Sequence, residues 1–195
     1  LALRPRADGV IQRVAGAGDV APHEDLVVRA AMALQAATGA ADGADILVDK
    51  HIPSGGGLGG GSSDAATTLV ALDHLWETGL DAGELARIGL ELGADVPVFV
   101  HGRAAWAEGV GEELTFVEPR EPWYLVIDPG VRVATRDLFA APELTRQCPA
   151  MTMHDFLSGG GSNVFEVPVR ERFPAVADAL DWLDGQGVTP RLTGT

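Results

Sequence analysis

Apolar residues recur at helical spacing in three stretches of the first half of the chain. Leu26 and Ala30 illustrate the pattern, because residues four apart lie on one face of a helix. Residues that can cap a helix precede the two later stretches. Ser62 or Ser63 precedes one of them, and Asp81 precedes the other, where Asp81 and Glu84 resemble a capping box. The predicted helices cover residues 25–38, 62–76 and 81–92.

Short stretches in which apolar and polar residues alternate predict strands. Ile46 and Val48 give this pattern in the stretch that follows the first helix. Beyond Gly93 several further strands are expected, and then more helices. The predicted strands are 44–50, 98–100, 103–108, 113–117 and 123–127, and the later helices are 135–140, 162–173 and 174–184. Because strands and helices are grouped and do not alternate strictly, the fold class expected is α+β.

A proline-containing stretch, residues 118–122, marks the expected boundary between two domains. The chain has 195 residues, of which 46% are hydrophobic and 22% charged. These values are those of a globular protein and exclude wholesale disorder. We expect one domain over 1–118 and a second over 119–195. The four tryptophans are predicted core aromatics: Trp76, Trp106, Trp123 and Trp182.

The chain is acidic, with 14 basic and 28 acidic residues and a formal net charge of −14. The arginines are scattered and Lys50 is the only lysine, so binding to a nucleic-acid backbone or an anionic membrane surface is disfavoured. A single cysteine, Cys148, excludes an intramolecular disulfide. No apolar run is long enough for a membrane-spanning helix. We expect a cytoplasmic protein, a monomer or homodimer, with neither nucleic acid nor membrane as a partner.

A glycine-rich segment lies between the strand predicted at 44–50 and the helix predicted at 62–76. Glycines let backbone N–H groups approach a ligand closely, and the helix start adds unpaired N–H groups and a positive dipole end. Such a segment binds an anion, most often phosphate. Ser62 and Ser63 add hydroxyl groups, and Ser63 is a candidate ligand for Mg²⁺. The segment comprises Pro53, Ser54, Gly55, Gly56, Gly57, Leu58, Gly59, Gly60, Gly61, Ser62 and Ser63.

The glycine-rich segment has three other interpretations. A flexible linker is disfavoured because the segment joins a strand directly to a capped helix. A dinucleotide fingerprint matches Gly55, Gly57 and Gly60, but the acidic residue that should close a second strand is missing, since a helix continues there. A P-loop is excluded because no lysine follows Gly60 or Gly61.

The pattern Pro-x-x-x-Gly-Leu-Gly-Gly-Gly-Ser-Ser-Asp-Ala-Ala over residues 53–66 resembles the phosphate-binding motif of the GHMP kinases, the group of galactokinase, homoserine kinase and mevalonate kinase. Residues 92–100 and 107–112 narrow the resemblance to the branch that phosphorylates diphosphocytidyl-methylerythritol in the non-mevalonate isoprenoid route. Shorter matches at 123–126, 128–131 and 162–163 fit the same branch. The resemblance extends over residues 25–195.

This resemblance implies transfer of the ATP γ-phosphoryl group to a hydroxyl of that small-molecule substrate, with Mg²⁺ as a cofactor. Residues 53–63 would cradle the triphosphate. Asp95 matches the family's catalytic base, which takes the proton of the attacking hydroxyl. From spacing alone, Asp95 would be only a turn residue between Gly93 and Pro97. Another alcohol substrate of the same kinase group, or a nucleotide-binding remnant without turnover, is the alternative.

The resemblance also implies a ribosomal-protein-S5-like first half and a ferredoxin-like second half. The family's catalytic lysine lies near the N-terminus, and Lys50 does not match its motif, so Lys50 is expected to be an exposed residue at a strand end. Thr193 and Gly194 match the start of a second glycine-rich motif and are candidate substrate contacts. We expect a chain truncated at both ends and impaired as it stands. The second glycine cluster, 159–161, is expected to be a turn or a second anion loop.

Overall fold

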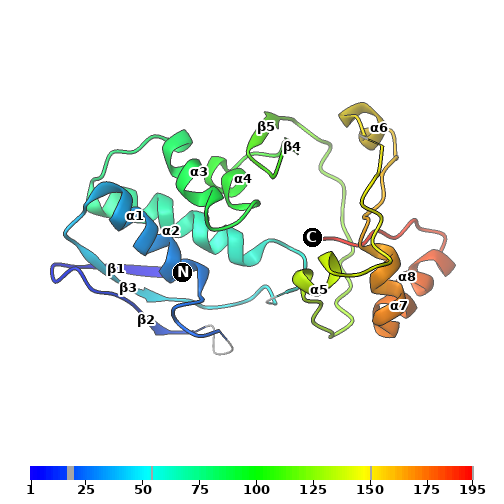
Figure 1. Ribbon diagram of the computed structural model, residues 1–195, viewed down its shortest axis with the longest axis horizontal. Coiled ribbons are helices and arrows are strands. Elements are labelled where there is room, and N and C mark those ends of the chain that lie inside the picture. Colours follow the sequence, from blue (N-terminus) through cyan, green and yellow to red (C-terminus); the bar gives the residue numbers. More distant parts are fainter. Residues whose placement is uncertain (17–19, 54, 150, 195) are drawn as a thin grey trace. The chain divides into compact units, whose positions relative to one another are not determined.

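The computed structural model describes residues 1–16, 20–53, 55–149 and 151–194, which contain eight helices and five strands (Figure 1). The chain divides into two compact units. The first comprises residues 1–53 and 59–120, and the second comprises 54–58 and 121–195. The assignment of 1–118 and 119–195 to the two domains of the kinase fold stays a prediction. In the described part of the chain, no helix has both the length and the apolar character needed to cross a membrane.

The first unit is built on a three-stranded sheet of β1 (Ala2–Arg6), β2 (Ile11–Ala15) and β3 (Gly43–Leu47), in the order β1-β3-β2. β1 runs antiparallel to β3, with Leu3 opposite Ile46, and β2 runs parallel to β3. Because parallel neighbours need a crossover, α1 (Leu26–Thr38) connects β2 to β3. The strand predicted at 44–50 is therefore present but shorter.

Side-chain caps explain where two helices of this unit begin. The Asp25 carboxylate accepts a hydrogen bond from the backbone N–H of Val27 (3.1 Å), and Arg13 pairs with the same carboxylate. At α3 (Ala82–Leu90), Asp81 and Glu84 form the predicted capping box, each accepting from the other's backbone N–H at 2.9 Å. These caps satisfy N–H groups that have no partner within the helix.

The first two helices of this unit pack on the sheet, and the helices and the sheet together bury one apolar core. Trp76, at the end of α2 (Gly60–Trp76), is part of that core, and its indole N–H donates to the Gly43 carbonyl (3.2 Å). The predicted helix start at Ser62 or Ser63 is wrong by two to three residues, because α2 begins at Gly60. The fully buried large side chains of the core are Leu34, Ile46, Leu69, Leu72, Val27 and Val96.

Residues 98–100, predicted as a strand, lie instead in α4 (Val96–His101). Pro97 stands in the first turn of this helix, where its missing N–H is no loss. Val96 is buried against Gly89 of α3, where a side-chain carbon would come within 2.6 Å of Val96. Packing therefore overrides the strand preference of the valines. The next two predictions are confirmed by the hairpin β4 (Ala105–Glu108) and β5 (Glu113–Phe116).

The second unit contains four helices and no strand among its described residues. Its core consists of Leu138, Ala141, Leu144, Phe165, Val169, Val176 and Leu180. The helices are α5 (Thr135–Phe139), α6 (Met153–Leu157), α7 (Glu166–Arg172) and α8 (Pro174–Gly185). α6 was not predicted, although its capping box of Thr152 and Asp155 is visible in the sequence.

The strand predicted at 123–127 is wrong for this structure: the segment has no regular structure, and Trp123 is fully exposed. Trp182 is also exposed, by 56%, so the prediction of core aromatics is wrong for these two residues and right for Trp76, which is 8% exposed. Strand-forming side chains are not sufficient for a strand, because a strand needs a neighbour with which to hydrogen-bond.

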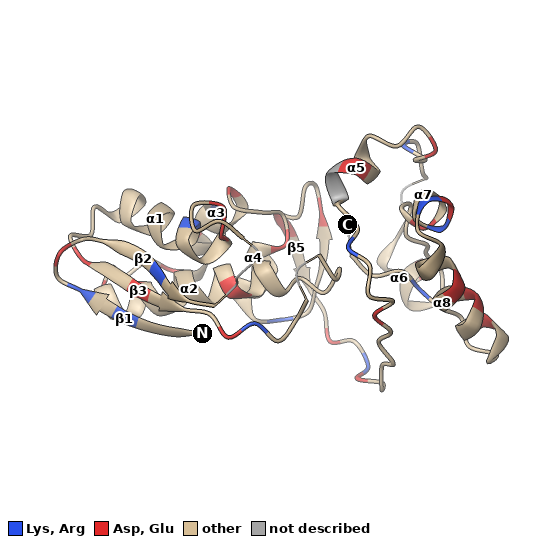
Figure 2. Ribbon diagram, turned by 90° about the horizontal axis from the view of Figure 1, so that it is seen from below, with Lys and Arg blue, Asp and Glu red and all other residues tan. Residues whose placement is uncertain are grey.

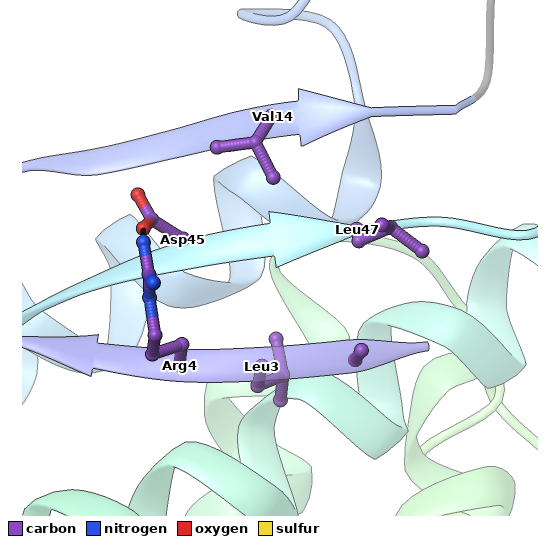
Figure 3. Close-up of a pocket in the computed structure, with 6 residues that line it drawn as sticks. Leu3, Arg4, Val14, Asp45 and Leu47 are labelled. Atoms are coloured by element: carbon purple, nitrogen blue, oxygen red, sulfur yellow. Dashed lines mark hydrogen bonds and ion pairs between the residues drawn. The ribbon is translucent and has the colours of Figure 1, made fainter.

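The strands of this sheet carry both basic and acidic residues (Figure 2). Asp45 of β3 is the centre of a charged cluster on the sheet face turned away from the helices (Figure 3). Asp45 accepts hydrogen bonds from Arg6 (2.8 Å) and Gln12 (2.8 Å) and pairs with Arg4, which reaches across from β1 (Figure 3). Hydrogen bonds from these donors, of which Arg4 has the largest effect, hold the pKa of Asp45 well below its usual 3.8. A shallow hollow of about 330 Å³ beside them is lined by Ala2, Leu3, Arg4, Val14, Asp45 and Leu47.

We expect Asp45→Asn to lower the free energy of unfolding at neutral pH. The difference from the unaltered protein should become smaller in acid. A carboxylate whose pKa is depressed by folding stabilises the protein above its unfolded-state pKa, near 3.8, and this contribution disappears as the pH falls toward the folded value. Urea unfolding of the two proteins at about pH 7 and at about pH 2.5 measures the difference. An equal gap at both pH values would contradict the assignment.

Candidate functional site

The start of α2 differs from the starts of α1 and α3. Gly59 holds a left-handed conformation (φ 65°), and no side chain caps the helix among the described residues. Gly60 and Gly61 follow without side chains that could cover the backbone. The first N–H groups of α2 are therefore free of the carboxylate caps seen at the other two helices, which suits them to an anionic ligand.

Phe99 of α4 packs against this helix start. A side-chain carbon placed on Gly59 would lie 2.8 Å from the Phe99 ring, so the ring rests directly on the glycine backbone. Phe99 follows Asp95 by four residues, and positions four apart in a helix lie on the same face. Asp95 therefore lies at the beginning of α4, about one turn from the residue that contacts the start of α2.

Asp95 is exposed and occupies the cap position of α4, but its side chain makes no capping hydrogen bond. The carboxylate is thus not used to stabilise the helix. The turn between β4 and β5 lies beside it, because a side-chain carbon on Gly111 (φ 115°) would come within 2.4 Å of the Ala94 carbonyl oxygen. The structure therefore brings together the two blocks, 92–100 and 107–112, that were singled out in the sequence.

Lys50 was expected to be an exposed strand-end residue, and this is wrong. Its Nζ pairs with the Asp64 carboxylate at 2.6 Å, and its side chain is only 22% exposed. The same nitrogen lies near Gly60, since a side-chain carbon there would come within 3.5 Å of it. Sequence reasoning missed this position, although the one lysine of an acidic chain lies directly at the entrance to a predicted anion-binding segment.

The second unit brings Gly57 together with Thr193 and Gly194. The Thr193 hydroxyl donates to the Gly57 carbonyl (2.9 Å), and a side-chain carbon on Gly57 would lie 2.3 Å from the Thr193 carbonyl oxygen. The Asn163 amide donates to the Gly194 carbonyl (2.7 Å) and fixes this C-terminal stretch. Only glycine permits so close an approach of two backbones.

The remaining positions of the predicted segment are distributed over both units. Ser62 and Ser63 lie half-buried in the first turns of α2, and the Ser63 N–H donates to the Gly59 carbonyl (2.8 Å). Ser54 lies outside the described residues. The exposed residues of this part of the segment are Pro53, Gly55, Gly56 and Leu58, whereas Gly57 is half-buried. Their role as a nucleotide cradle stays a prediction.

The second glycine cluster is not an anion loop. The Arg191 guanidinium donates to the carbonyl oxygens of Gly159 (2.9 Å), Gly160 (3.0 Å) and Gly161 (3.3 Å). The loop thus turns its carbonyl oxygens, not its N–H groups, toward a charged partner. Of the two interpretations left open for this cluster, the turn is the one the structure favours.

Comparisons with known proteins identify the architecture. Residues 25–103 match the model of the GHMP kinases N terminal domain. A solved structure described as that of 4-(cytidine 5'-diphospho)-2C-methyl-D-erythritol kinase superposes with a TM-score of 0.68 at 31% identity, covering 96% of this chain and 70% of that one. The chain therefore has the α+β fold of the GHMP kinases, and it belongs to that class of ATP-dependent small-molecule kinases.

Two bacterial relatives narrow the class. The chain is 58% identical to 4-diphosphocytidyl-2-C-methyl-D-erythritol kinase of Nitrosococcus oceani, over all of this chain and 69% of that protein. It is also 58% identical to the kinase of the same name from Halorhodospira halophila, over 99% of this chain and 68% of that protein. The chain belongs to the family of 4-diphosphocytidyl-2-C-methyl-D-erythritol kinases.

Proposed function

We propose that this protein transfers the γ-phosphoryl group of ATP to a hydroxyl of 4-diphosphocytidyl-2-C-methyl-D-erythritol, a step in non-mevalonate isoprenoid synthesis. The observation that carries the proposal is the geometry of the first unit: an uncapped, glycine-lined start of α2 lies against the helix that begins at Asp95. The names of the bacterial relatives and of the solved structure support the choice of substrate.

The triphosphate of ATP is proposed to bind to the N–H groups at the start of α2. They act together with the positive end of the dipole of a 17-residue helix. Gly59, Gly60 and Gly61 allow the phosphate oxygens to approach the backbone because no side chain intervenes. Pro53, Leu58 and the glycines between them, with Ser54, complete the proposed cradle. Binding here holds the γ-phosphate in place, which is the largest part of catalysis in this type of reaction.

Asp95 is the proposed base. Its carboxylate is exposed and makes no cap hydrogen bond, so it is available to a substrate hydroxyl. The hydroxyl proton passes to the carboxylate as the hydroxyl oxygen attacks the γ-phosphorus, and the bond to the ADP oxygen breaks. Thr193 and Gly194 are proposed substrate contacts. They are supported by their contact with Gly57 of the glycine-rich segment.

Mg²⁺ is the proposed cofactor, and its chemistry is to neutralise charge on the phosphate oxygens. The Ser63 hydroxyl is an oxygen donor of the kind this ion prefers, and it lies half-buried near the start of α2. The dependence on ATP supports a cytoplasmic location. The oligomeric state stays a prediction, which is a monomer or a homodimer.

The test is release of ADP from Mg-ATP with and without the proposed alcohol, in the protein with the termini that its gene encodes. We expect release to depend on 4-diphosphocytidyl-2-C-methyl-D-erythritol and not on homoserine, mevalonate or galactose. Release with only one of these three alcohols would show that the protein is a kinase but that its substrate is that alcohol. A folded protein that binds ATP and releases no ADP with any alcohol would contradict the catalytic proposal and favour a non-catalytic nucleotide-binding role.

A further inference from the structure

The ion pair between Lys50 and Asp64 closes the base of the glycine-rich segment within the first unit. Lys50 lies shortly after β3, which ends at Leu47, and Asp64 lies in the second turn of α2. The pair therefore joins the stretch that enters the segment to the helix that leaves it. Nζ and Oδ2 are 2.6 Å apart, and the side chains are 22% and 28% exposed. The Ile52 side chain also contacts the start of α2, since a side-chain carbon on Gly60 would come within 2.9 Å of it.

Asp64 places a negative charge close to the helix start. Gly60 and Asp64 are four residues apart and therefore lie on one face of α2, about one turn from each other along the axis. A triphosphate bound to the first N–H groups of α2 would meet this carboxylate at short range. The whole chain carries a net charge of −14, so its general field also opposes an anionic ligand.

We infer that Lys50 is a positioning residue for the nucleotide: its ammonium group neutralises Asp64 and so permits the triphosphate to occupy the start of α2. The inference rests on the proposed nucleotide site and assigns Lys50 a role that acts through Asp64, not through contact with phosphate. The ion pair is only partly buried, and a pair with this much access to solvent contributes modestly to stability, so we expect variants at Lys50 to remain folded. The consequence of losing Lys50 is instead an uncompensated carboxylate beside the ligand.

A charge cycle at the two positions tests the inference through the Kd of Mg-ATP, measured by isothermal titration calorimetry. We expect Lys50→Met to raise Kd by roughly 10- to 100-fold, an effect that shrinks as salt is added. Lys50→Arg should keep the affinity near that of the unaltered protein. Asp64→Asn should bind at least as tightly as the unaltered protein, and the double variant Lys50→Met/Asp64→Asn should recover most of the loss.

Arg172→Met provides the matched control. Arg172 pairs with Glu143 in the second unit at 2.7 Å, with both side chains 35% exposed, so its removal also leaves a half-exposed carboxylate without its partner. We expect no change in Kd for this variant. Thermal unfolding of every variant confirms that each is folded.

Two results would overturn the inference and leave the proposed nucleotide site intact. A double variant that binds as poorly as Lys50→Met would show that Lys50 contacts the nucleotide itself. A loss of affinity in Asp64→Asn would show that the carboxylate is needed, as a ligand or as a structural link. If the unaltered, folded protein does not bind Mg-ATP, the proposed nucleotide site fails and the inference fails with it, a result distinct from the other two.

Discussion

Asp95→Asn should lower the rate of phosphoryl transfer by roughly 10²- to 10⁴-fold, the usual contribution of a general base. The amide is similar in size and exposed like the carboxylate, but it cannot accept the hydroxyl proton. Because Asp95 makes no cap hydrogen bond in α4, the substitution removes no interaction that stabilises the helix. Steady-state ADP release measures the loss, and the Kd of Mg-ATP is expected to change little.

Asp178→Asn is the control for this prediction. Asp178 is an exposed aspartate of α8 in the second unit, so the variant makes the same chemical change away from the proposed site. It should retain the full rate. A variant Asp95→Asn that also retains the full rate would show that another group takes the proton, or that the substrate hydroxyl attacks without a base.

Gly59→Ala should raise the Kd of Mg-ATP by at least about tenfold, which corresponds to roughly 1.4 kcal/mol. Alanine at a left-handed position costs about 1 to 2 kcal/mol, and here the methyl group would also lie 2.8 Å from the Phe99 ring. Either the ring moves, which disturbs the packing of α4 against the start of α2, or the start of α2 moves, which disturbs its N–H groups. Calorimetry and urea unfolding separate the effect on affinity from the effect on stability.

The variant Gly79→Ala measures the loss of stability that backbone strain alone causes. Gly79 has a similar conformation (φ 72°), but a side-chain carbon there would meet nothing within 4 Å. Both variants should lose comparable stability from backbone strain, and only Gly59→Ala should lose nucleotide affinity. Equal affinity for Mg-ATP in the two variants would show that the start of α2 does not take part in nucleotide binding.

Local signals in the sequence were sufficient for the elements that carry their own caps. The helix after Asp25 and the capping box of Asp81 and Glu84 are as predicted, because the capping hydrogen bonds are made between residues two or three apart. The two strands of the β4–β5 hairpin were also predicted, since each is a short stretch with its own local pattern. The start of α2 was missed because serine is a good cap by propensity, whereas here Gly59 supplies the conformation itself.

The elements that depend on distant partners were not predictable in the same way. Residues 98–100 form a helix because Val96 packs against Gly89, and residues 123–127 have strand-forming side chains but no strand beside them. At the proposed site, the glycines and Asp95 were chosen from the family resemblance, and their roles stay predictions. The Lys50–Asp64 pair and the contact of Phe99 with Gly59 arise only when the segment folds back, so no spacing in the sequence reveals them.

The central claim is transfer of a phosphoryl group from ATP to an alcohol, and ³¹P nuclear magnetic resonance of the reaction mixture tests it most directly. With Mg-ATP and 4-diphosphocytidyl-2-C-methyl-D-erythritol, we predict a new phosphomonoester signal that grows in step with ADP, and none with Asp95→Asn. ADP accompanied only by inorganic phosphate, or no change in ATP with a folded protein that binds it, would contradict the claim.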